Sequence, residues 1–435
     1  MQPQPLPGFR DFYPADLAFR NYLFDTWRKV CRGYGFEEFD GPPLEPLELY
    51  TAKSGEEIVG QLYNFVDKGG REVALRPELT PTVARMVAAH AGGMKKPIRW
   101  FSIGQMFRYE RQQKGRLREF YQLNCDLIGE DQYPADAEII ALAIDLIRAF
   151  GFDETQVRIR VSDRALLGAL LEGIGLTEDQ VPAAYAVLDK VHRMRPEQRD
   201  EIRQGKDPRL GPRGAGVLEL AKLKSWSDVV QALGKTPNAA GARDRFANVL
   251  GCLRDAGLDR FIDVDVTIVR GLAYYTGTVF EVFDASGSLR AIAGGGRYDK
   301  LLEMLGGVDL PAVGFAVGDV VLGELLRSSG RGPAARPAID VFVAGVTIED
   351  RPQVLRTVHE LREAEVRVEY SLRNEALGKQ LKLADTRGAR FAVVIGPDDR
   401  ARSEVQLKDL AAKTQRAVAA AALVGELTRQ LGSST

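Results

Sequence analysis

The sequence predicts an α+β fold in which helices flank an antiparallel sheet, with a helical insertion and a small C-terminal α/β domain. Two observations predict this class. Short apolar strands and helical patterns follow one another without regular βαβ alternation, which favours an antiparallel sheet. Strands resume after a long, mainly helical stretch, so both halves of the chain build the sheet. A chain of 435 residues exceeds one efficient core, and several domains are expected.

Elements of the first half follow from apolar spacing and from turn residues. Apolar residues such as Leu23 and Trp27 recur at helical spacing until Gly35, which predicts a helix. Gly69 and Gly70 separate two short apolar runs and predict a hairpin. The expected elements are, in order, a helix over 16–35, an extended segment over 36–39, strands over 63–66 and 72–75, a helix over 77–90, and paired strands over 98–108 and 119–128.

The second half divides into a helical region, further strands and a separate C-terminal domain. Residues 134–257 have a mainly helical pattern, with helices expected over 135–150, 165–174, 181–190 and 242–256. Strands over 263–269, 277–283 and 290–293 follow, then a helix over 298–305; near the C-terminus, strands over 339–344, 366–370 and 391–395 alternate with helices over 351–363 and 374–386. The predicted limits are 1–160 and 259–327 for the sheet domain, 161–258 for the insertion, 328–336 for a linker and 337–435 for the C-terminal domain.

The charge balance gives no global attraction for a polyanion. Lys and Arg number 59 and Asp and Glu number 60, so any nucleic-acid binding must come from local patches. The three cysteines include no CxxC pair, so neither a disulfide framework nor a thiolate zinc site is indicated. The N-terminus lacks a basic-then-apolar leader and no apolar run is long enough to span a bilayer. We therefore expect a cytoplasmic protein without membrane partners.

The segment from Phe107 to Gln122 carries the densest set of groups that could hold a nucleotide. Arginine offers a planar fork that matches phosphate oxygens, Glu110 could accept from the exocyclic amine of adenine, and Phe120 could stack on the base. A solvated charged hairpin is the alternative, and charge density alone favours it. The basic residues that suit a polyphosphate or a tRNA end are Arg108, Arg111, Lys114, Arg116 and Arg118.

Two later segments, VRGLAYYTGTVFE over 269–281 and AGGGRYD over 293–299, carry further candidates. Arg270 lies beside a glycine and can approach a phosphate closely, while Tyr274 and Tyr275 can wall an aromatic substrate and donate a hydrogen bond. A glycine triplet lets a ligand or another backbone pass near a strand. Each segment taken singly has a plainer interpretation, as an ordinary alternating strand or an ordinary turn. No Walker loop, dinucleotide fingerprint or HExxH site occurs.

Taken together and in order, these segments resemble those of histidyl-tRNA synthetases, a family of class II aminoacyl-tRNA synthetases. FRYERQQKGRLREFYQ resembles class II motif 2, while RGLAYYTGTVFE and AGGGRYDKLLEMLGG resemble the two histidine-specific segments. YGFEEFDGPPLEPLELY is similar to motif 1, with Pro42 at the proline of that motif, and ALRPELTPTVAR to a further family segment. NEALGKQLKLADTRGARFAVVIG resembles the anticodon-binding domain. The resemblance covers nearly the whole chain except 160–255.

The resemblance implies an ATP-dependent ligase that activates L-histidine as its adenylate and transfers histidine to tRNA(His), releasing AMP and diphosphate. It implies ATP with Mg²⁺ and a homodimer formed through motif 1, around residues 35–44. The implied catalytic residues are Arg270 and Arg108; the implied ATP-binding residues are Arg108, Glu110, Arg116, Phe120 and Arg270; the implied histidine-binding residues are Glu78, Thr80, Gln122, Asp126, Tyr274, Tyr275 and Tyr298. No protein side chain is assigned to a metal, because His90, His192 and His359 lack paired ligand spacing.

Asp126 and Tyr298 would read the two edges of an imidazole ring, since a carboxylate accepts from one ring nitrogen and a tyrosine serves the other. A wrong amino acid would leave buried polar groups unpaired. Each residue also has a structural alternative: Asp126 could pair with a neighbouring arginine, and Tyr298 could be a core tyrosine.

Motif 3 departs from the family pattern. The family normally reads GFAxGLERL, whereas this chain reads GFAVGDVVL, so Val321 stands at the arginine position; Ala273 likewise replaces an aspartate. Either another arginine supplies the charge or activation has been lost. The alternative function is a non-catalytic paralogue, such as the regulatory subunit of ATP phosphoribosyltransferase or a sensor of uncharged tRNA. That subunit typically lacks the anticodon domain and the intact histidine-specific segments that this chain retains. A generic RNA-binding module, a third reading, predicts a basic chain, against the net charge of −1.

Overall fold

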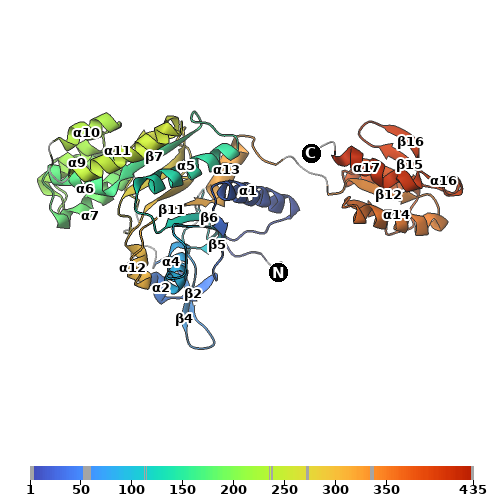
Figure 1. Ribbon diagram of the computed structural model, residues 1–435, viewed down its shortest axis with the longest axis horizontal. Helices are drawn as coiled ribbons and strands as arrows, with labels where there is room; N and C mark the ends of the chain where they lie inside the picture. The colour runs from blue at the N-terminus through green and yellow to red at the C-terminus, as the bar shows by residue number, and fades with distance from the viewer. Residues whose placement is uncertain are drawn as a thin grey trace. The chain divides into compact units, whose positions relative to one another are not determined.

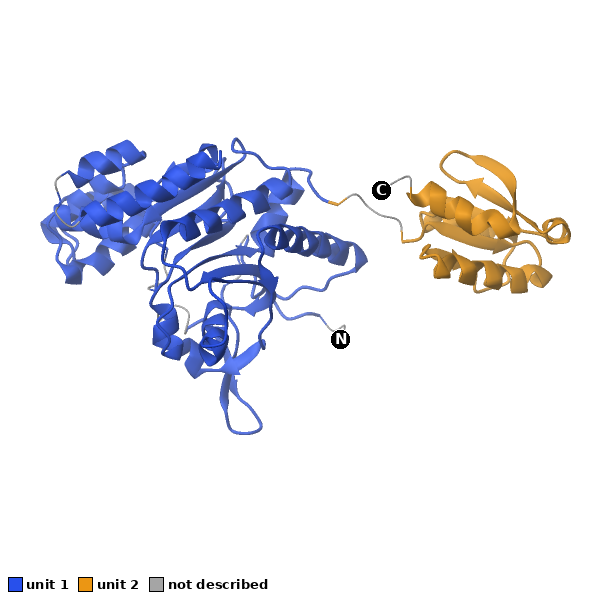
Figure 2. Ribbon diagram, viewed as in Figure 1, with its two compact units in different colours: residues 1–332 blue, residues 333–435 orange. Residues whose placement is uncertain are grey.

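The computed structural model describes residues 4–51, 60–111, 113, 115–234, 236, 239–270, 274–333 and 338–432. The chain divides into two compact units, Met1–Gly332 and Pro333–Thr435, each with its own hydrophobic core (Figure 2). The predicted linker at 328–336 contains this division, although its residues from 334 onward lie outside the described part. Within the described ranges, no helix is long and apolar enough to cross a membrane.

An eight-stranded sheet organises the larger unit, in the order β1-β5-β6-β11-β10-β9-β7-β8 (Figure 1). Its central strands are antiparallel, as predicted, but the pairs β1 with β5 and β7 with β8 are parallel, so the sheet is mixed. Strands from both halves of the chain therefore lie side by side. The strands are β1 (Glu37–Glu38), β5 (Ile98–Phe107), β6 (Glu119–Ile128), β7 (Val157–Asp163), β8 (Ile262–Val264), β9 (Thr278–Asp284), β10 (Ala293–Arg297) and β11 (Ala312–Gly318).

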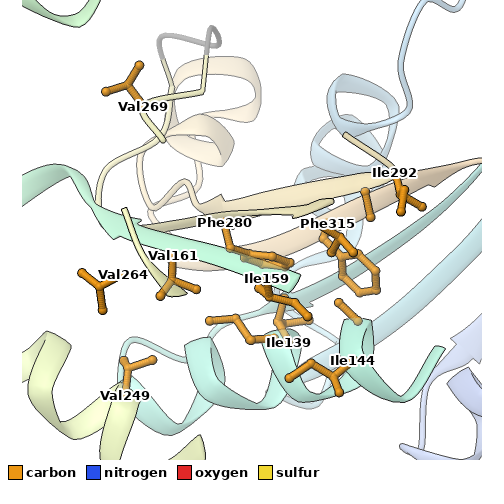
Figure 3. Packing of buried hydrophobic residues seen from close by; sticks show 14 of the residues in the cluster. Ile139, Ile144, Ile159, Val161, Val249, Val264, Val269, Phe280, Ile292 and Phe315 are labelled. Atoms are coloured by element: carbon orange, nitrogen blue, oxygen red, sulfur yellow. The ribbon is translucent and has the colours of Figure 1, made fainter. Parts of the chain in front are cut away.

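Three helices cover one face of this sheet: α1 (Pro14–Gly33), α5 (Tyr133–Ala149) and α13 (Asp319–Ser328). Helix α5 packs against α1 and β11, and α13 packs against β6. Ile139 and Ile144 of α5 lie beneath Ile159 and Phe280 of the sheet (Figure 3). Because α5 is apolar on nearly all sides, it is buried in the main core.

Near the other face lie a small sheet, in the order β2-β4-β3, and the helices α2, α4 and α12. The predicted hairpin is confirmed, since β3 pairs antiparallel with β4. The helices expected over 77–90 and 298–305 both begin later than predicted, and Glu78 and Tyr298 lie in the preceding loops. The elements are β2 (Leu44–Pro46), β3 (Tyr63–Val66), β4 (Glu72–Leu75), α2 (Glu48–Thr51), α4 (Thr80–His90) and α12 (Leu301–Gly306).

The strand predicted over 290–293 is wrong, because the strand is β10 and it contains the glycine triplet. Glycine is depleted in strands, so the sequence pattern placed this run in a turn. A Cβ added at Gly295 would lie 2.2 Å from the carbonyl oxygen of Gly314 on β11. The absence of a side chain at this position is therefore a condition for the two strands to pair.

A strand also runs through the region predicted to be mainly helical. Strand β7 lies between β9 and β8, with Val157, Ile159 and Val161 buried and Arg158 and Arg160 partly exposed. This alternation of apolar and polar residues is the period-two signal of a half-buried strand. The prediction over 263–269 is also too long, since β8 ends at Val264. The helices around β7 are α6 (Arg164–Gly173), α7 (Val181–Lys190), α8 (Pro196–Arg203), α9 (Gly214–Leu220), α10 (Trp226–Leu233) and α11 (Ala239–Asp255).

The smaller unit is an α/β domain, as predicted, with a five-stranded sheet in the order β13-β12-β14-β15-β16. Its first three strands are parallel, and two further antiparallel strands and two further helices were not predicted. Helices α14 and α15 pack against β12. The elements are β12 (Val341–Gly345), α14 (Arg351–Glu363), β13 (Val368–Tyr370), α15 (Leu377–Thr386), β14 (Phe391–Ile395), α16 (Pro397–Arg402), β15 (Glu404–Asp409), β16 (Thr414–Ala419) and α17 (Leu423–Gly432).

Candidate active site

A cleft in the larger unit gathers most of the residues that the resemblance marks for ligand binding. It contains all of the predicted histidine-binding residues and both predicted catalytic arginines. Three residues predicted for ATP, namely Glu110, Arg116 and Phe120, do not line it. The lining residues are Glu78, Thr80, Arg108, Gln122, Asn124, Asp126, Arg270, Tyr274, Tyr275, Gly294, Tyr298, Gly314, Phe315 and Ala316.

Alternation along β6 builds the floor of this cleft. Leu123 and Cys125 belong to the main core, whereas Asn124 and Asp126 line the cleft, because successive side chains of a strand point to opposite faces. Gly314 of β11 stands opposite Asp126, and a Cβ there would lie 2.4 Å from the Asp126 Oδ1 atom. Sequence reasoning missed Asn124 and Gly314. Period-two spacing from Gln122 to Asp126 was the available signal for Asn124.

Asp126 and Tyr298 form a buried polar pair at the cleft. The hydroxyl of Tyr298 donates a hydrogen bond to Oδ1 of Asp126, and the two side chains are almost fully buried. Burial raises the pKa of Asp126 to about 7, although the hydrogen bond from Tyr298 opposes this shift. The pair can present a carboxylate oxygen and a phenolic oxygen to one ligand. The alternative of an arginine partner for Asp126 does not hold in the described part of the chain.

Glu78 and Tyr274 form a second polar contact beside this pair. The hydroxyl of Tyr274 donates to Oε2 of Glu78 at 3.4 Å. Burial raises the pKa of Glu78, while the nearby Arg108, Tyr274 and Arg270 lower it. The ring of Tyr274 lies 5.0 Å from that of Tyr275 and 5.9 Å from that of Tyr298, measured between centroids. Three tyrosine rings therefore wall a cleft that holds two carboxyl groups and two arginines.

Arg270 holds its guanidinium at the edge of the cleft. Its backbone has φ of +54°, a left-handed conformation that is rare for arginine and costs energy unless the surroundings fix it. Nη1 donates to Oε1 of Glu281 at 2.7 Å, and a Cβ added at Gly294 would lie 2.6 Å from Nη1. Burial lowers the pKa of Arg270, but Tyr275 and Glu281 raise it by more. The net shift of the pKa is upward, so the guanidinium stays charged. Its Nε has no hydrogen-bond partner among the described residues.

Arg108 reaches the same cleft from the end of the β5 strand. Its Nε donates to the carbonyl oxygen of Pro77 at 2.9 Å, and its guanidinium carbon lies 5.3 Å from the centroid of the Phe120 ring. Glu110 and Arg116 form an ion pair with each other beside this point. Glu110, Arg116 and Phe120, which were predicted to bind ATP, thus form a group on the hairpin outside the cleft lining, whereas Arg108 and Arg270 belong to the lining.

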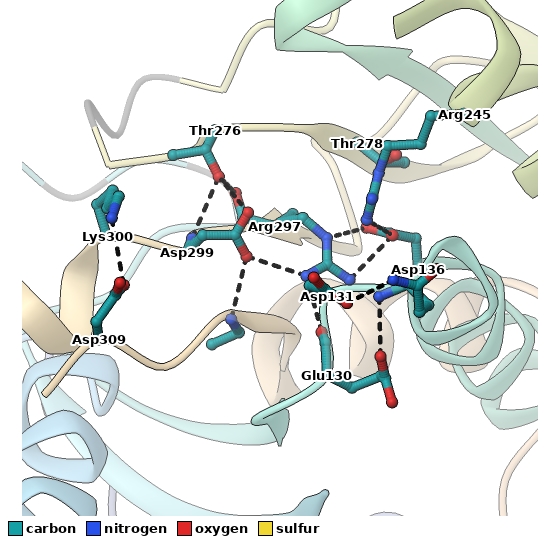
Figure 4. Close-up of polar contacts among 12 residues, drawn as sticks. Glu130, Asp131, Asp136, Arg245, Thr276, Thr278, Arg297, Asp299, Lys300 and Asp309 are labelled. Carbon is teal, nitrogen blue, oxygen red and sulfur yellow. Dashed lines mark hydrogen bonds and ion pairs between the residues drawn. The ribbon is translucent and has the colours of Figure 1, made fainter. Parts of the chain in front are cut away.

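Arg297 anchors the loop that carries Tyr298. It is buried in full, and its Nε and Nη2 donate to the carboxylate of Asp136 on α5 at 2.8 and 3.0 Å. Nη1 donates to Asp299 at 3.0 Å and to the carbonyl oxygen of Glu130 at 3.0 Å (Figure 4). These bonds tie the end of β10 to α5 on one side and to the following loop on the other. Arg297 therefore positions Tyr298 without lining the cleft.

The motif 3 segment begins α13 without an arginine. Asp319 accepts from Nη1 of Arg10 at 2.8 Å and from the backbone N–H of Tyr121 at 2.9 Å. Val321 is 9% exposed and belongs to the main core. The start of α13 is thus fixed by an aspartate that replaces part of the family pattern, while position 321 contributes only apolar packing.

Comparison with known proteins assigns both units. A family model described as Histidyl-tRNA synthetase matches residues 8–319, and one described as Anticodon binding domain matches residues 340–430. Histidine–tRNA ligase of Opitutus terrae is 48% identical over 419 residues, covering 95% of each chain. That of Haloarcula marismortui is 40% identical over 426 residues, covering 97% of each. A crystal structure of histidyl-tRNA synthetase from Nostoc sp. PCC 7120 matches with a TM-score of 0.81 and 28% identity, covering 98% of this chain and 99% of that one.

The mixed sheet, the cleft with its two arginines and the separate C-terminal unit define a class II aminoacyl-tRNA synthetase. Within that class, the chain belongs to the histidyl-tRNA synthetase family. Relatives that carry the ligase name cover the C-terminal unit as well as the larger unit, which favours the ligase over the non-catalytic alternative.

Proposed function

We propose that this chain activates L-histidine with Mg·ATP and transfers the histidyl group to tRNA(His), releasing AMP and diphosphate. The observation that carries the proposal is the buried Asp126–Tyr298 pair, which lies in one cleft with Arg108 and Arg270. A carboxylate and a phenol suit an imidazole, and two guanidinium groups suit a phosphate. One site would therefore hold the amino acid and the α-phosphate together.

Recognition of the imidazole would use the two oxygens of the polar pair. Tyr298 donates its hydroxyl proton to Oδ1 of Asp126, so the second carboxylate oxygen stays available to accept from a ring N–H. The three tyrosine rings would enclose the ring faces. A substrate without a ring N–H at this position would leave the second carboxylate oxygen of Asp126 buried without a donor, which costs more than a loss of shape complementarity.

The α-amino and carboxylate groups would be held at the opposite side of the cleft. Glu78, kept close to Arg108 and Arg270, is suited to the ammonium group, and Thr80 and Gln122 add neutral hydrogen-bonding groups. Nη1 of Arg270 bonds to Glu281, while its Nε has no hydrogen-bond partner among the residues that the structure describes. This donor is suited to an oxygen of the reacting carboxylate or of the α-phosphate.

In the activation step, a carboxylate oxygen of histidine forms a bond to the α-phosphorus as the bond to the diphosphate oxygen breaks. Negative charge rises on the oxygens around phosphorus, and fixed cations at Arg108 and Arg270 would lower the barrier. In the transfer step, a ribose hydroxyl of the tRNA attacks the carbonyl carbon, loses its proton and displaces AMP.

The ATP molecule would be held by residues of the motif 2 hairpin. Phe120 and Glu110 would hold adenine, and Arg116 would hold the terminal phosphates. Magnesium would arrive with ATP on phosphate oxygens.

The remaining assignments concern partners. We propose that the C-terminal unit binds the tRNA anticodon, supported by its match to the anticodon-binding family. We also propose a homodimer through residues 35–44, and the cytoplasm as the compartment, because the reaction requires ATP and tRNA. These assignments rest on the family to which the chain belongs.

Histidine-dependent exchange of diphosphate into ATP, followed by aminoacylation of tRNA(His), tests the proposal. The expected result is exchange with histidine and none with other amino acids, then formation of histidyl-tRNA. A folded protein that binds histidine but gives no exchange would be the non-catalytic paralogue instead.

A further inference from the structure

The start of α13 lacks the arginine that motif 3 of the family contributes to the ATP site. The family pattern places an arginine where this chain has Val321, which is buried in the main core. A triphosphate carries several negative charges, and binding it requires fixed positive groups near each end. We therefore expect an arginine from another element to lie near Val321 and to supply this charge.

Arg290 arrives from the loop before β10. Strand β10 pairs antiparallel with β11, with Ala293 opposite Val317, and β11 leads directly into α13. The residues just before Ala293 thus pass beside the beginning of α13. A Cβ added at Gly115 would lie 3.4 Å from Cγ2 of Val321, 3.6 Å from Oε2 of Glu324 and 3.9 Å from Cδ of Arg290. Val321 and Arg290 therefore border the same point of the motif 2 hairpin, together with the carboxylate of Glu324.

Arg290 lies near charges of both signs: Arg116 and Arg193 are positive, and Glu110 and Glu324 are negative. Its Nη2 donates to Oε1 of Gln113, and in the described part of the chain it forms no ion pair with a carboxylate. Burial lowers the pKa of Arg290, as do the neighbouring Arg116 and Arg193, while Glu110 raises it. Glu110 is already paired with Arg116. An anionic ligand would offset the repulsion between Arg290 and its neighbours Arg116 and Arg193.

We propose that Arg290 supplies the cation that the family takes from motif 3, and that it binds the terminal phosphates of ATP. This inference rests on the proposed function and names a residue that the resemblance does not mark. The charge has moved from the first turn of α13 to the loop before β10, and both positions border Gly115 of the motif 2 hairpin. Arg290 lies outside the cleft lining, so it should act on ATP without touching histidine.

The test moves the positive charge from position 290 to position 321 by mutation. Arg290→Ala should raise KM for ATP in the exchange assay by about 10- to 100-fold, the loss expected for a charge-assisted hydrogen bond to phosphate. KM for histidine should change little. Adding Val321→Arg to Arg290→Ala should recover at least part of the lost affinity for ATP. Arg254→Ala, an exposed arginine of α11, is the control and should leave both constants unchanged.

Unchanged KM for ATP in Arg290→Ala, with an unchanged melting temperature, would overturn the inference. If that variant folds poorly, Arg290→Gln keeps the first three carbons of the side chain and a polar end group but removes the charge, and it should show the same loss of ATP affinity. If the wild-type chain gives no exchange at all, the proposed function fails. Calorimetric binding of Mg·ATP then decides the inference alone, since equal affinity of wild-type and Arg290→Gln protein would overturn it and weaker binding by the variant would support it.

Discussion

Asp126 is a buried carboxyl whose ionisation sets when the site can accept from an imidazole N–H. Because its pKa in the folded protein is about 7, the carboxylate forms only as pH rises through that value. We expect kcat/KM for histidine in the exchange assay to increase between pH 6 and pH 8. Asp126→Asn should have a lower kcat/KM without this increase. The titration of free histidine is common to both proteins, so identical pH profiles would contradict the assignment.

The same shift has a consequence for stability. The folded pKa is raised above the ordinary value of 3.8, so the fold favours the neutral acid. The associated stability is fully present at pH values below 3.8 and is lost as pH rises through about 7. In urea unfolding, the contribution of Asp126 to the free energy of unfolding of the wild-type protein should therefore decrease as pH rises over this range. Asp126→Asn should lack this decrease.

Arg270 is predicted to stabilise charge in the transition state rather than the fold. Arg270→Ala should reduce exchange by about 100-fold or more, the loss that follows removal of a preorganised charge stabiliser. The melting temperature should change little, because the side chain is 21% exposed and its pairing with Glu281 is at the edge of the cleft. Exchange at a near-normal rate in a folded variant would contradict this role.

At the scale of elements, Arg297 joins β10 to α5 through a carboxylate that is fully buried. Arg297→Met should destabilise the protein by about 3–5 kcal/mol, because it leaves Asp136 without its main partner. Chemical denaturation with a tryptophan signal measures the change. Arg245→Met is the matched control: Arg245 also pairs with Asp136, but it is 33% exposed and should matter less. Equal free energies of unfolding for the two variants would show that the buried Arg297–Asp136 pair stabilises the fold no more than the Arg245–Asp136 pair.

Period and turn chemistry predicted the long elements well, and contacts between distant segments explain the failures. The hairpin of β3 and β4, the strand β6 and the helix α14 have the predicted bounds, since each carries an uninterrupted local pattern. Strand β10 was misplaced because only its close approach to β11 makes glycine favourable there. The cleft residues were found through the resemblance, and alternation alone would have added Asn124. Arg290 could not be found from sequence, since only the register of β10 and β11 brings it near Val321.

At the scale of the whole molecule, the smaller unit should contribute tRNA affinity without chemistry. Lys379 and Lys382 are exposed on α15, whereas Gln380 is buried and donates to the carbonyl oxygen of Gly345 at 2.8 Å. Neutralising both lysines should weaken tRNA binding and flatten its dependence on salt, because fewer counterions are released. Exchange should be unchanged. Full aminoacylation by a folded chain lacking 337–435 would exclude an anticodon role for this unit.

The homodimer is a prediction about the surface around residues 35–44. Sedimentation at micromolar concentration should give twice the mass of the 47.9 kDa chain. Replacing exposed Leu44 with Glu should shift the protein towards the monomer, because a charge would enter the interface. The control is Leu372→Glu, an exposed leucine of the smaller unit. A fully active monomer would exclude the dimer as a requirement.

The position of β11 bears on how the protein is made. It comes last along the chain among the eight strands, yet it pairs in the middle of the sheet, between β6 and β10. Synthesis proceeds from the N-terminus, so β6 and β10 belong to two unconnected parts of the sheet until residues 312–318 leave the ribosome. Gly314 and Ala316 of that strand complete the floor of the cleft. A nascent chain therefore has no site for free histidine until nearly all of the larger unit has been translated.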